Sequence, residues 1–202
     1  TAIDSQKITK NSRIYTVCKM EHAGGMLAQT LPAISIGADI VIEEFNVKRF
    51  IKEIHKYTHT HITPRQAKII INSKNFNEMD LSNIWITCGS DCVDWESIKA
   101  FVRRGATFMA NWGMSEIGPC AINIIFSNED SINDYISLAP NNLPIMGENF
   151  YCDYQISDLN ELIVKGDICI YDDWFFTGDL VIKKIKISSY DESPVIYFLG
   201  RN

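Results

Sequence analysis

The stretch IWITCGSDCVDWESIKAFVRRGATFMANW, residues 84–112, decides the fold class of this chain. Residues 84–88 form a short apolar run that is typical of a strand, and the glycine turn 89–93 ends it. A helix follows, with apolar side chains at helical spacing in Trp95, Ile98, Phe101 and Val102. Residues 107–112 form a second apolar strand. This strand, helix, strand unit predicts a mostly parallel sheet, whose ligands bind beyond the carboxyl ends of its strands.

The residues before this stretch repeat the same alternation. We expect strands at residues 14–18, 39–43 and 60–63, and helices at residues 26–36, 47–54 and 64–71. Asn46 is placed to cap the second of these helices, and Pro64 suits the first turn of the third. The Val and Ile run at 39–43 indicates a buried parallel strand, and residues 72–80 indicate a surface loop.

The sequence changes in character after Ser127. A polar segment and a Pro and Asn segment precede short alternating runs at 153–156, 161–165, 168–171, 180–187 and 195–199. No amphipathic helix is expected in this half. We therefore predict an α/β fold: a parallel-rich sheet with flanking helices in residues 1–135, followed by a smaller antiparallel, β-barrel-like subdomain in residues 136–202.

Composition excludes several classes of protein. The chain has 202 residues, 46% hydrophobic and 22% charged, which are globular rather than disordered values. Its net charge is −6 and its basic residues are scattered, which argues against nucleic-acid and membrane partners. No apolar run reaches the ~18 residues of a membrane span. We expect a cytoplasmic protein.

The metal-binding residue types show no familiar ligand spacing. Cys88 and Cys92 are separated by three residues without a second pair, which argues against a zinc site. His59 and His61 would share one face of a strand, but no third ligand accompanies them. Reduced and mostly buried thiols are the expectation for the six cysteines.

Three short segments carry candidate chemistry because each lies at an expected strand end or turn. They are residues 88–91 (CGSD), 111–116 (NWGMSE) and 177–180 (TGDL). Taken singly each is weak, because a Gly-Ser-Asp or Thr-Gly-Asp sequence is most often a simple turn and a tryptophan at a strand end is usually core. Their order and spacing are more specific than any one of them.

Together these segments resemble the adenylate-forming (AMP-binding) superfamily, which includes acyl-CoA synthetases and the adenylation domains of peptide synthetases. In that family Tyr-Gly-x-Thr-Glu precedes Thr-Gly-Asp, and Gly-Arg follows at a hinge; this chain has WGMSE at 112–116, TGD at 177–179 and GR at 200–201. Residues 161–166 (ELIVKG) resemble a further family stretch, and residues 22–25 (HAGG) resemble its His-x-x-Gly element. The resemblance runs from about residue 14 to residue 202.

The resemblance implies roles for the nucleotide-binding residues. Trp112 stands for the tyrosine that stacks on adenine, and it keeps a flat aromatic face while losing the phenol. Asp179 would accept hydrogen bonds from both ribose hydroxyls, and Arg201 would contact the ribose or phosphate. The adenine would be bordered by Gly89, Ser90 and Asp91.

It also implies the catalytic and acyl-binding residues. Ser115 keeps a hydroxyl that can donate to the α-phosphate, and Glu116 would hold Mg²⁺ together with phosphate oxygens. The acyl pocket would be faced by His22, Gly113 and Met114. The implied reaction joins a small carboxylic acid to AMP from ATP and passes the acyl group to a thiol or amine acceptor, with coenzyme A or a carrier protein as candidates.

The sequence departs from the family at both ends. The family's phosphate loop has no counterpart in residues 1–15, and the C-terminal domain with its catalytic lysine would follow Asn202. We therefore expect a fragment that is inactive alone. Two alternatives stay open: a non-catalytic nucleotide- or acyl-binding protein that kept the fold, and an unrelated α/β protein with chance matches.

Overall fold

The stretch 84–112 forms the expected strand, helix and strand: β4 (Trp85–Cys88), α6 (Trp95–Arg103) and β5 (Thr107–Met114). They belong to a computed structural model that describes residues 1–187 and 192–202. α6 begins at Asp94, whose carboxylate accepts a hydrogen bond from the Ser97 backbone N–H at 2.8 Å. The strands β4 and β5 pair in parallel, as predicted.

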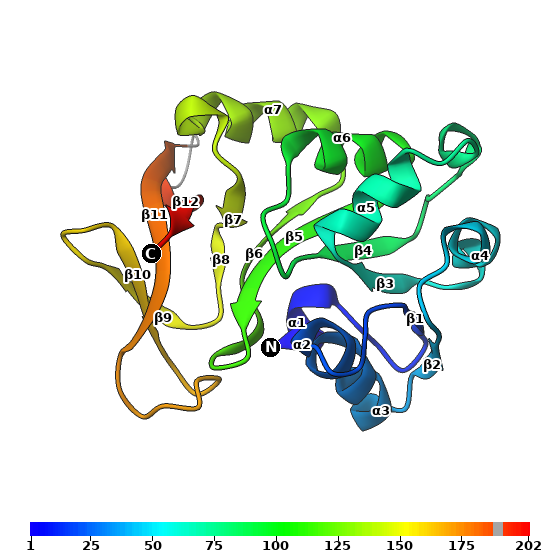
Figure 1. Cartoon of the computed structure of the whole chain (residues 1–202), viewed down its shortest axis with the longest axis horizontal. Coiled ribbons are helices and arrows are strands. Elements are labelled where there is room, and N and C mark those ends of the chain that lie inside the picture. Colours follow the sequence, from blue (N-terminus) through cyan, green and yellow to red (C-terminus); the bar gives the residue numbers. More distant parts are fainter. Residues whose placement is uncertain (188–191) are drawn as a thin grey trace.

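Two sheets make up the molecule (Figure 1). Sheet A has seven strands in the order β2-β1-β3-β4-β5-β6-β8, and sheet B has five in the order β7-β12-β11-β10-β9. The other strands of sheet A are β1 (Arg13–Thr16), β2 (Asp39–Ile42), β3 (His59–Ile62), β6 (Gly118–Phe126) and β8 (Asn149–Phe150). Those of sheet B are β7 (Ile145–Gly147), β9 (Asp153–Ile156), β10 (Glu161–Lys165), β11 (Phe175–Ile187) and β12 (Glu192–Arg201).

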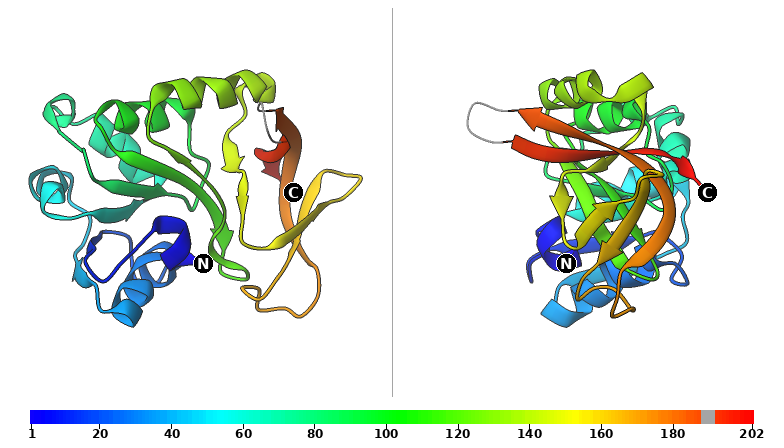
Figure 2. Two further views of the ribbon diagram at one scale, coloured as in Figure 1. Left: turned by 180° about the vertical axis from the view of Figure 1, so that it is seen from behind. Right: turned by 90° about the vertical axis from the view of Figure 1, so that its left-hand side faces the viewer.

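Helices cover both faces of sheet A (Figures 1 and 2). One face carries α4 (Val47–Glu53), α5 (Pro64–Ile71), α6 and α7 (Glu129–Leu138). The other carries α1 (Ala2–Gln6), α2 (Ala23–Gly25), a π-helical turn (Met26–Thr30) and α3 (Leu31–Ile36). Short 3₁₀ turns lie at Ile54–Lys56, Phe76–Glu78 and Pro140–Asn142. Within the described part of the chain, no helix is long and apolar enough to cross a membrane.

The order of the first five strands confirms the parallel-rich sheet. Pairs β2–β1, β1–β3, β3–β4 and β4–β5 are all parallel, whereas β5–β6 and β6–β8 are antiparallel. The predicted caps are confirmed as well. Asn46 accepts the Arg49 backbone N–H at 3.1 Å, and Pro64 opens α5 after Thr63, whose hydroxyl and Gln66 form a capping box.

The second half contains the antiparallel sheet that was predicted, with β9 and β10 at the predicted bounds. All four pairs of sheet B are antiparallel. β7 and β9 are its outer strands, so within residues 1–187 and 192–202 the sheet is open and the barrel-like closure is not found.

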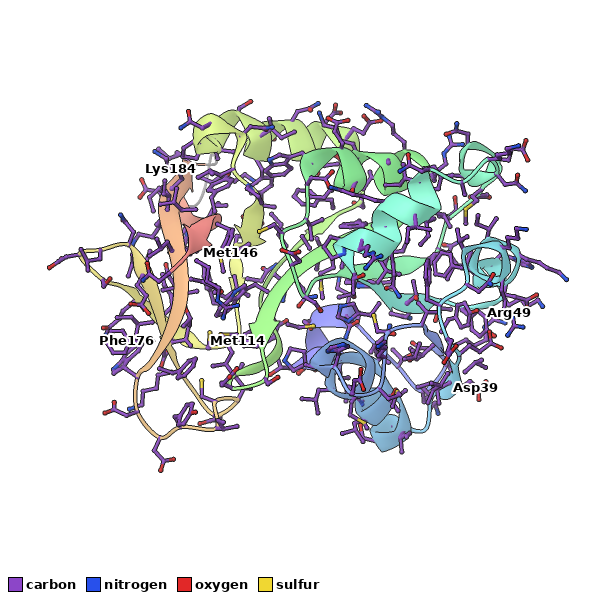
Figure 3. The ribbon with its side chains drawn as sticks, viewed as in Figure 1. Asp39, Arg49, Met114, Met146, Phe176 and Lys184 are labelled. Atoms are coloured by element: carbon purple, nitrogen blue, oxygen red, sulfur yellow. The ribbon has the colours of Figure 1, made fainter. Side chains whose placement is uncertain are left out.

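The two sheets are joined by a cluster of apolar side chains from β6 and from sheet B, including its strand β7. Met114 and Met146 lie between the sheets, whereas Phe176 and Lys184 lie on the outer parts of sheet B (Figure 3). This cluster has a buried centre of Ile117, Ala121, Ile122, Met146, Leu162, Val164, Val181 and Ile196. The apolar packing fixes sheet B beside the end of β5, where the candidate site lies.

Helix α7 overturns the prediction that the second half has no amphipathic helix. Asn128 caps it by accepting the Ser131 backbone N–H at 2.9 Å, and Ile132 and Tyr135 are buried on one face. Tyr135 also donates its hydroxyl proton to Glu148 at 2.6 Å. The polar residues that open the helix obscured its apolar spacing in the sequence.

Other predictions for single segments were wrong. Residues 39–43 do form a parallel strand, but β2 is an edge strand that pairs with β1 and is largely exposed. Residues 168–171 form part of the turn between β10 and β11, with Ile170 68% exposed. By contrast, the surface loop expected at 72–80 is confirmed, although Phe76 is buried in a 3₁₀ turn within it. β6 was not predicted at all.

Candidate functional site

One pocket of about 530 Å³ gathers the sequence-predicted residues at the end of β5, beside sheet B. Its predicted lining residues are His22, Ser90, Asp91, Trp112, Gly113, Met114, Ser115, Glu116, Asp179 and Arg201. The remaining predicted site residue, Gly89, does not line the pocket. Segments as far apart in the chain as His22 and Arg201 therefore meet at one place.

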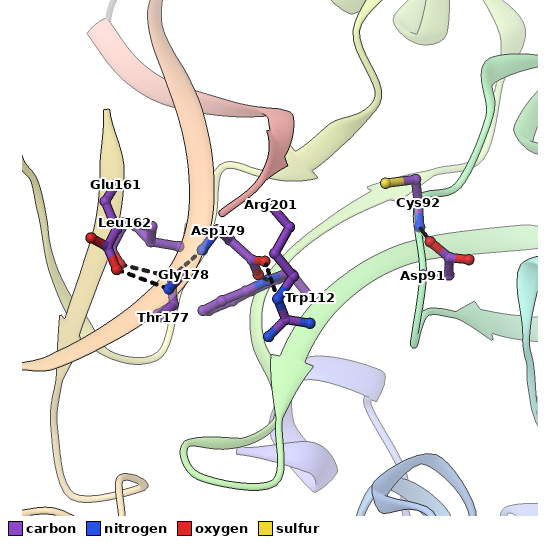
Figure 4. Close-up of polar contacts among 9 residues, drawn as sticks. All are labelled: Asp91, Cys92, Trp112, Glu161, Leu162, Thr177, Gly178, Asp179 and Arg201. Carbon is purple, nitrogen blue, oxygen red and sulfur yellow. Dashed lines mark hydrogen bonds and ion pairs between the residues drawn. The ribbon is translucent and has the colours of Figure 1, made fainter. Parts of the chain in front are cut away.

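A tryptophan, a carboxylate and a guanidinium form the polar centre of the pocket (Figure 4). The Trp112 indole Nε1–H donates to Oδ2 of Asp179 at 2.8 Å. The other carboxylate oxygen, Oδ1, lies 3.3 Å from Nε of Arg201. Asp179 and Arg201 are opposite each other on the antiparallel strands β11 and β12. The Asp179 side chain is 8% exposed and the Arg201 side chain 61% exposed.

The Thr-Gly-Asp segment, expected as a turn, lies within strand β11 and is hydrogen-bonded to the neighbouring strand β10 (Figure 4). The Thr177 hydroxyl donates to the Leu162 carbonyl at 2.7 Å and accepts the Asp179 backbone N–H at 3.1 Å. The Gly178 backbone N–H donates to Oε1 of Glu161 at 2.9 Å. Gly178 has a φ of +73°, which a residue with a side chain adopts at a cost. These bonds place Asp179 at the pocket.

Ser115 and Glu116 lie in the tight turn between β5 and β6. A β-carbon on Gly113 would lie 2.5 Å from the Gly118 carbonyl oxygen, so the close approach of the two strands requires glycine there. The Glu116 carbonyl accepts the Ile170 backbone N–H at 2.8 Å. The turn therefore presents a hydroxyl and a carboxylate to the pocket from a backbone fixed on two sides.

The loop after β4 has a different role for each of its residues. A β-carbon on Gly89 would lie 2.3 Å from Nδ2 of Asn111, so this glycine is needed for packing on β5. Ser90 has a φ of +79°, and the Asp91 carboxylate accepts the Cys92 backbone N–H at 2.7 Å (Figure 4). The loop border of the pocket is thus made by residues 90–93.

The His-x-x-Gly element lies at the start of α2. His22 is exposed and lines the pocket together with Ala23. Gly24 lies directly over the buried His61 of β3, where a β-carbon would come 2.9 Å from Cε1 of the imidazole. Burial lowers the pKa of His61 to about 4, so its ring is neutral near pH 7. The glycine permits the close approach of helix and sheet.

The two histidines of β3 lie on the same face, as predicted for a strand. The ring of His59 is hydrogen-bonded to the Thr58 hydroxyl at 2.8 Å and to the Gln6 carbonyl at 3.0 Å. Its pKa is lowered, mainly by burial. Among the described residues no group of three or more His, Cys, Asp or Glu side chains is arranged to hold a metal ion.

Three carboxylates and one guanidinium give the pocket its charge. Asp91, Glu116 and Asp179 line it, with Arg201 as the strongly basic side chain. Glu116 fits a magnesium ion, since Mg²⁺ is commonly bound through one or two carboxylates together with substrate phosphates. The adenosine part of a nucleotide also fits, because an indole face and a nearly buried carboxylate adjoin each other here.

Sequence reasoning missed several lining residues of the pocket. These are Ala23, Cys92, Val93, Asn111, Pro144, Ile145, Met146 and Phe198. Some had a signal: Asn111 belongs to the candidate segment 111–116, and Cys92 and Val93 lie in the predicted glycine turn 89–93. Ile145, Met146 and Phe198 come from strands of sheet B, whose approach to sheet A no local pattern indicates.

Comparison with known proteins agrees with this geometry. Residues 1–178 match the family model described as AMP-binding enzyme. The chain is also similar to an indoleacetate–CoA ligase of Aromatoleum aromaticum, with 27% identity over 199 residues, covering 89% of this chain and 39% of the ligase. The chain thus spans about two fifths of the length of this curated relative.

Solved structures share the fold. An o-succinylbenzoate CoA synthetase from Bacillus subtilis bound with a product analogue has a TM-score of 0.76 at 16% identity, covering 100% of this chain and 43% of that chain. A complex of the same synthetase with ATP and magnesium gives 0.74 at 16% identity, covering 99% and 44%. ATP-bound MatB from Rhodopseudomonas palustris gives 0.74 at 14% identity, covering 98% and 42%.

Proposed function

Because the chain belongs to the AMP-binding enzyme family, we propose that its pocket binds the adenosine monophosphate part of an acyl adenylate in a carboxylate–CoA ligase reaction. The observation that supports this most is the convergence of Trp112, Ser115, Glu116 and Asp179 on one pocket. Each of these side chains supplies a contact that a nucleotide needs, and no protein nucleophile is required.

The nucleoside would be held by Trp112, Asp179 and Arg201. The indole face of Trp112 stacks on the adenine, and the Asp179 carboxylate accepts hydrogen bonds from the ribose hydroxyls. Asp91 and Ser90 border the base from the loop after β4. His22 and Met114 lie at the same pocket, where they would face the acyl group.

The phosphate would be held at the turn between β5 and β6. The Ser115 hydroxyl would donate to an oxygen of the α-phosphate, and Glu116 would hold Mg²⁺ together with phosphate oxygens. When bound, the ion neutralises charge that develops on the phosphate oxygens. The residues therefore orient the α-phosphorus of ATP toward a carboxylate oxygen of the acid. That oxygen attacks, pyrophosphate leaves, and the sulfur of a thiol such as coenzyme A, having lost its proton, then attacks the acyl carbon of the acyl adenylate and releases AMP.

A binding function without turnover is the second candidate. The pocket carries three carboxylates against one guanidinium, which favours a nucleoside monophosphate over the more highly charged triphosphate. We therefore expect this chain alone to bind AMP or an acyl-adenylate mimic and to turn over ATP slowly or not at all.

Calorimetric titration with AMP and with a non-hydrolysable acyl adenylate tests the proposal. We expect saturable binding that Asp179→Ala reduces at least tenfold, because the ribose loses its charged acceptor. Asp153→Ala is the matched control, since Asp153 is an exposed carboxylate on β9 outside the pocket. Absence of binding by folded protein would contradict the proposal. Rapid exchange of pyrophosphate into ATP would contradict the expectation of little turnover.

A further inference from the structure

The hydrogen bond from Trp112 to Asp179 gives the indole a second contact in the pocket besides its ring face. Nε1 of Trp112 and Oδ2 of Asp179 are 2.8 Å apart, which is a short charge-assisted hydrogen bond (Figure 4). A phenylalanine in place of Trp112 offers a similar ring face but no donor at this position. The sequence comparison with the family tyrosine indicated the loss of a phenol, and the structure adds the gain of this N–H.

The remaining acceptor capacity of Asp179 matches a ribose. An ionised carboxylate has about four lone-pair positions. Trp112 occupies one on Oδ2, and Arg201 at 3.3 Å faces Oδ1. One position on each oxygen is left, and the side chain, 8% exposed, lines the pocket. Two adjacent acceptors are what the 2′ and 3′ hydroxyls of a ribose require.

The direction of the N–H also matters. An indole N–H lies in the plane of the ring, so its bond to Asp179 leaves the ring faces free to stack. A base on the face of Trp112 would therefore have its sugar near the edge of the ring, on the side where Asp179 lies. Trp112 thus fixes the plane of the base through its ring face, and it orients the carboxylate that accepts from the sugar through its N–H.

We propose that Trp112 is a positioning residue that orients the Asp179 carboxylate and thereby sets selectivity for ribonucleotides over 2′-deoxyribonucleotides. The inference rests on the proposed function, because it assigns a ribose to Asp179. The proposal predicts a result that stacking of the base on Trp112 alone would not give. Loss of the indole N–H weakens recognition of the sugar, whereas loss of stacking alone weakens AMP and 2′-deoxy-AMP equally.

Calorimetry with Trp112→Phe measures this difference. The wild type should bind AMP more tightly than 2′-deoxy-AMP. In Trp112→Phe, AMP affinity should fall about tenfold, and the ratio of the two dissociation constants should shrink toward one. Trp95→Phe is the matched control, because the Trp95 indole donates to the Leu143 carbonyl at 3.1 Å and neither residue lines the pocket. It removes an indole N–H and should leave the ratio unchanged.

A ligand-free measurement keeps the inference testable if Trp112→Phe folds poorly. In ¹⁵N-labelled protein, the Trp112 Nε1–H proton should resonate downfield of that of Trp95, whose acceptor is a neutral carbonyl. Trp85, whose buried Nε1–H has no acceptor within the described residues, supplies the unbonded reference. Asp179→Asn should move the Trp112 signal upfield and leave the other two in place.

The outcomes separate the two claims. If the wild type binds AMP but Trp112→Phe keeps the wild-type ratio, the inference is wrong while the proposed function stands. A Trp112 Nε1–H chemical shift that does not change in Asp179→Asn likewise overturns the inference. If the wild type binds neither nucleotide while Trp112 still reports its bond to Asp179, the proposed function fails, and the inference fails with it.

Discussion

The Glu161 carboxylate accepts a hydrogen bond from the Gly178 backbone N–H, with 2.9 Å between Oε1 and N. Glu161 begins β10, and Gly178 lies in β11 beside Asp179, which lines the pocket. Two sequence motifs that resemble family elements are thus parts of one hydrogen-bonded unit. The bond explains why a carboxylate stands at the first position of ELIVKG although Glu161 does not line the pocket.

Removing this acceptor should loosen the Thr-Gly-Asp segment of β11. We expect Glu161→Ala to lower the free energy of unfolding by about 1–2 kcal/mol, because a partly buried N–H loses its partner. AMP affinity should fall several-fold as Asp179 loses its fixed position. Urea denaturation and calorimetry measure both effects. Glu161→Gln keeps an acceptor oxygen and should behave nearly as the wild type; equal behaviour of the Ala variant would contradict this account.

Gly24 should tolerate no side chain. A β-carbon there would lie 2.9 Å from Cε1 of the buried His61, so the imidazole, the helix or the strand must shift. We expect Gly24→Ala to reduce the free energy of unfolding by about 1–3 kcal/mol through overpacking. Gly200→Ala is the control for stability, because nothing lies within 4 Å of its β-carbon, and its effect should stay within about 0.5 kcal/mol. Equal denaturation midpoints would refute this packing argument.

The buried imidazole of His61 predicts a pH dependence of stability. Its pKa is about 4 in the folded protein, against an ordinary value near 6.5 in the unfolded chain. Between these values the unfolded chain binds the additional proton, so stability declines as pH falls from about 7 toward 4, by about 3 kcal/mol for this group.

Denaturation at a series of pH values checks this, with His61→Gln as the neutral comparison. The variant should show a shallower fall of stability with decreasing pH, while His22→Gln, at an exposed histidine, should keep the wild-type slope. Identical slopes for the wild type and His61→Gln would count against the neutral, buried ring.

Nucleotide binding should protect Cys92 from alkylation. Cys92 is exposed and lines the pocket, although burial and the nearby Asp91 and Asp179 raise its pKa. At pH 8.5 we expect iodoacetamide to modify it before the buried Cys18 and Cys120, whose pKa values burial raises to about 12.

Saturating AMP should slow modification of Cys92 several-fold in peptide mass spectra. Cys169 is partly exposed and does not line the pocket, so it serves as an internal control in the same sample. Protection of Cys92 and Cys169 to the same degree, or of neither, would show that AMP does not occupy this pocket.

Periodicity and capping residues were sufficient for the five parallel strands of sheet A, but not for its antiparallel strands β6 and β8. Asn46 and Pro64 marked helix starts that the structure confirms, because these signals are local. Helix α7 was missed because its first turn is polar, and β2 was taken as buried because its Val and Ile residues suit any strand. Edge position depends on what packs nearby, which a single segment does not reveal.

The candidate site was predicted from motifs rather than from patterns of hydrophobicity. Ten of the predicted residues line one pocket, and the exception, Gly89, is explained by its contact with Asn111. The bond between Trp112 and Asp179 was beyond sequence reasoning, because it joins strands of two sheets. Its existence depends on how sheet B packs on β6, and that packing involves side chains scattered over half of the chain.

A crystal structure of this chain with bound AMP tests the central claim most directly. The account predicts an adenine ring stacked on the face of Trp112, with ribose hydroxyls within about 3.2 Å of the Asp179 carboxylate and the phosphate beside Ser115. An AMP molecule bound elsewhere, or one whose base and sugar contact neither Trp112 nor Asp179, would contradict it.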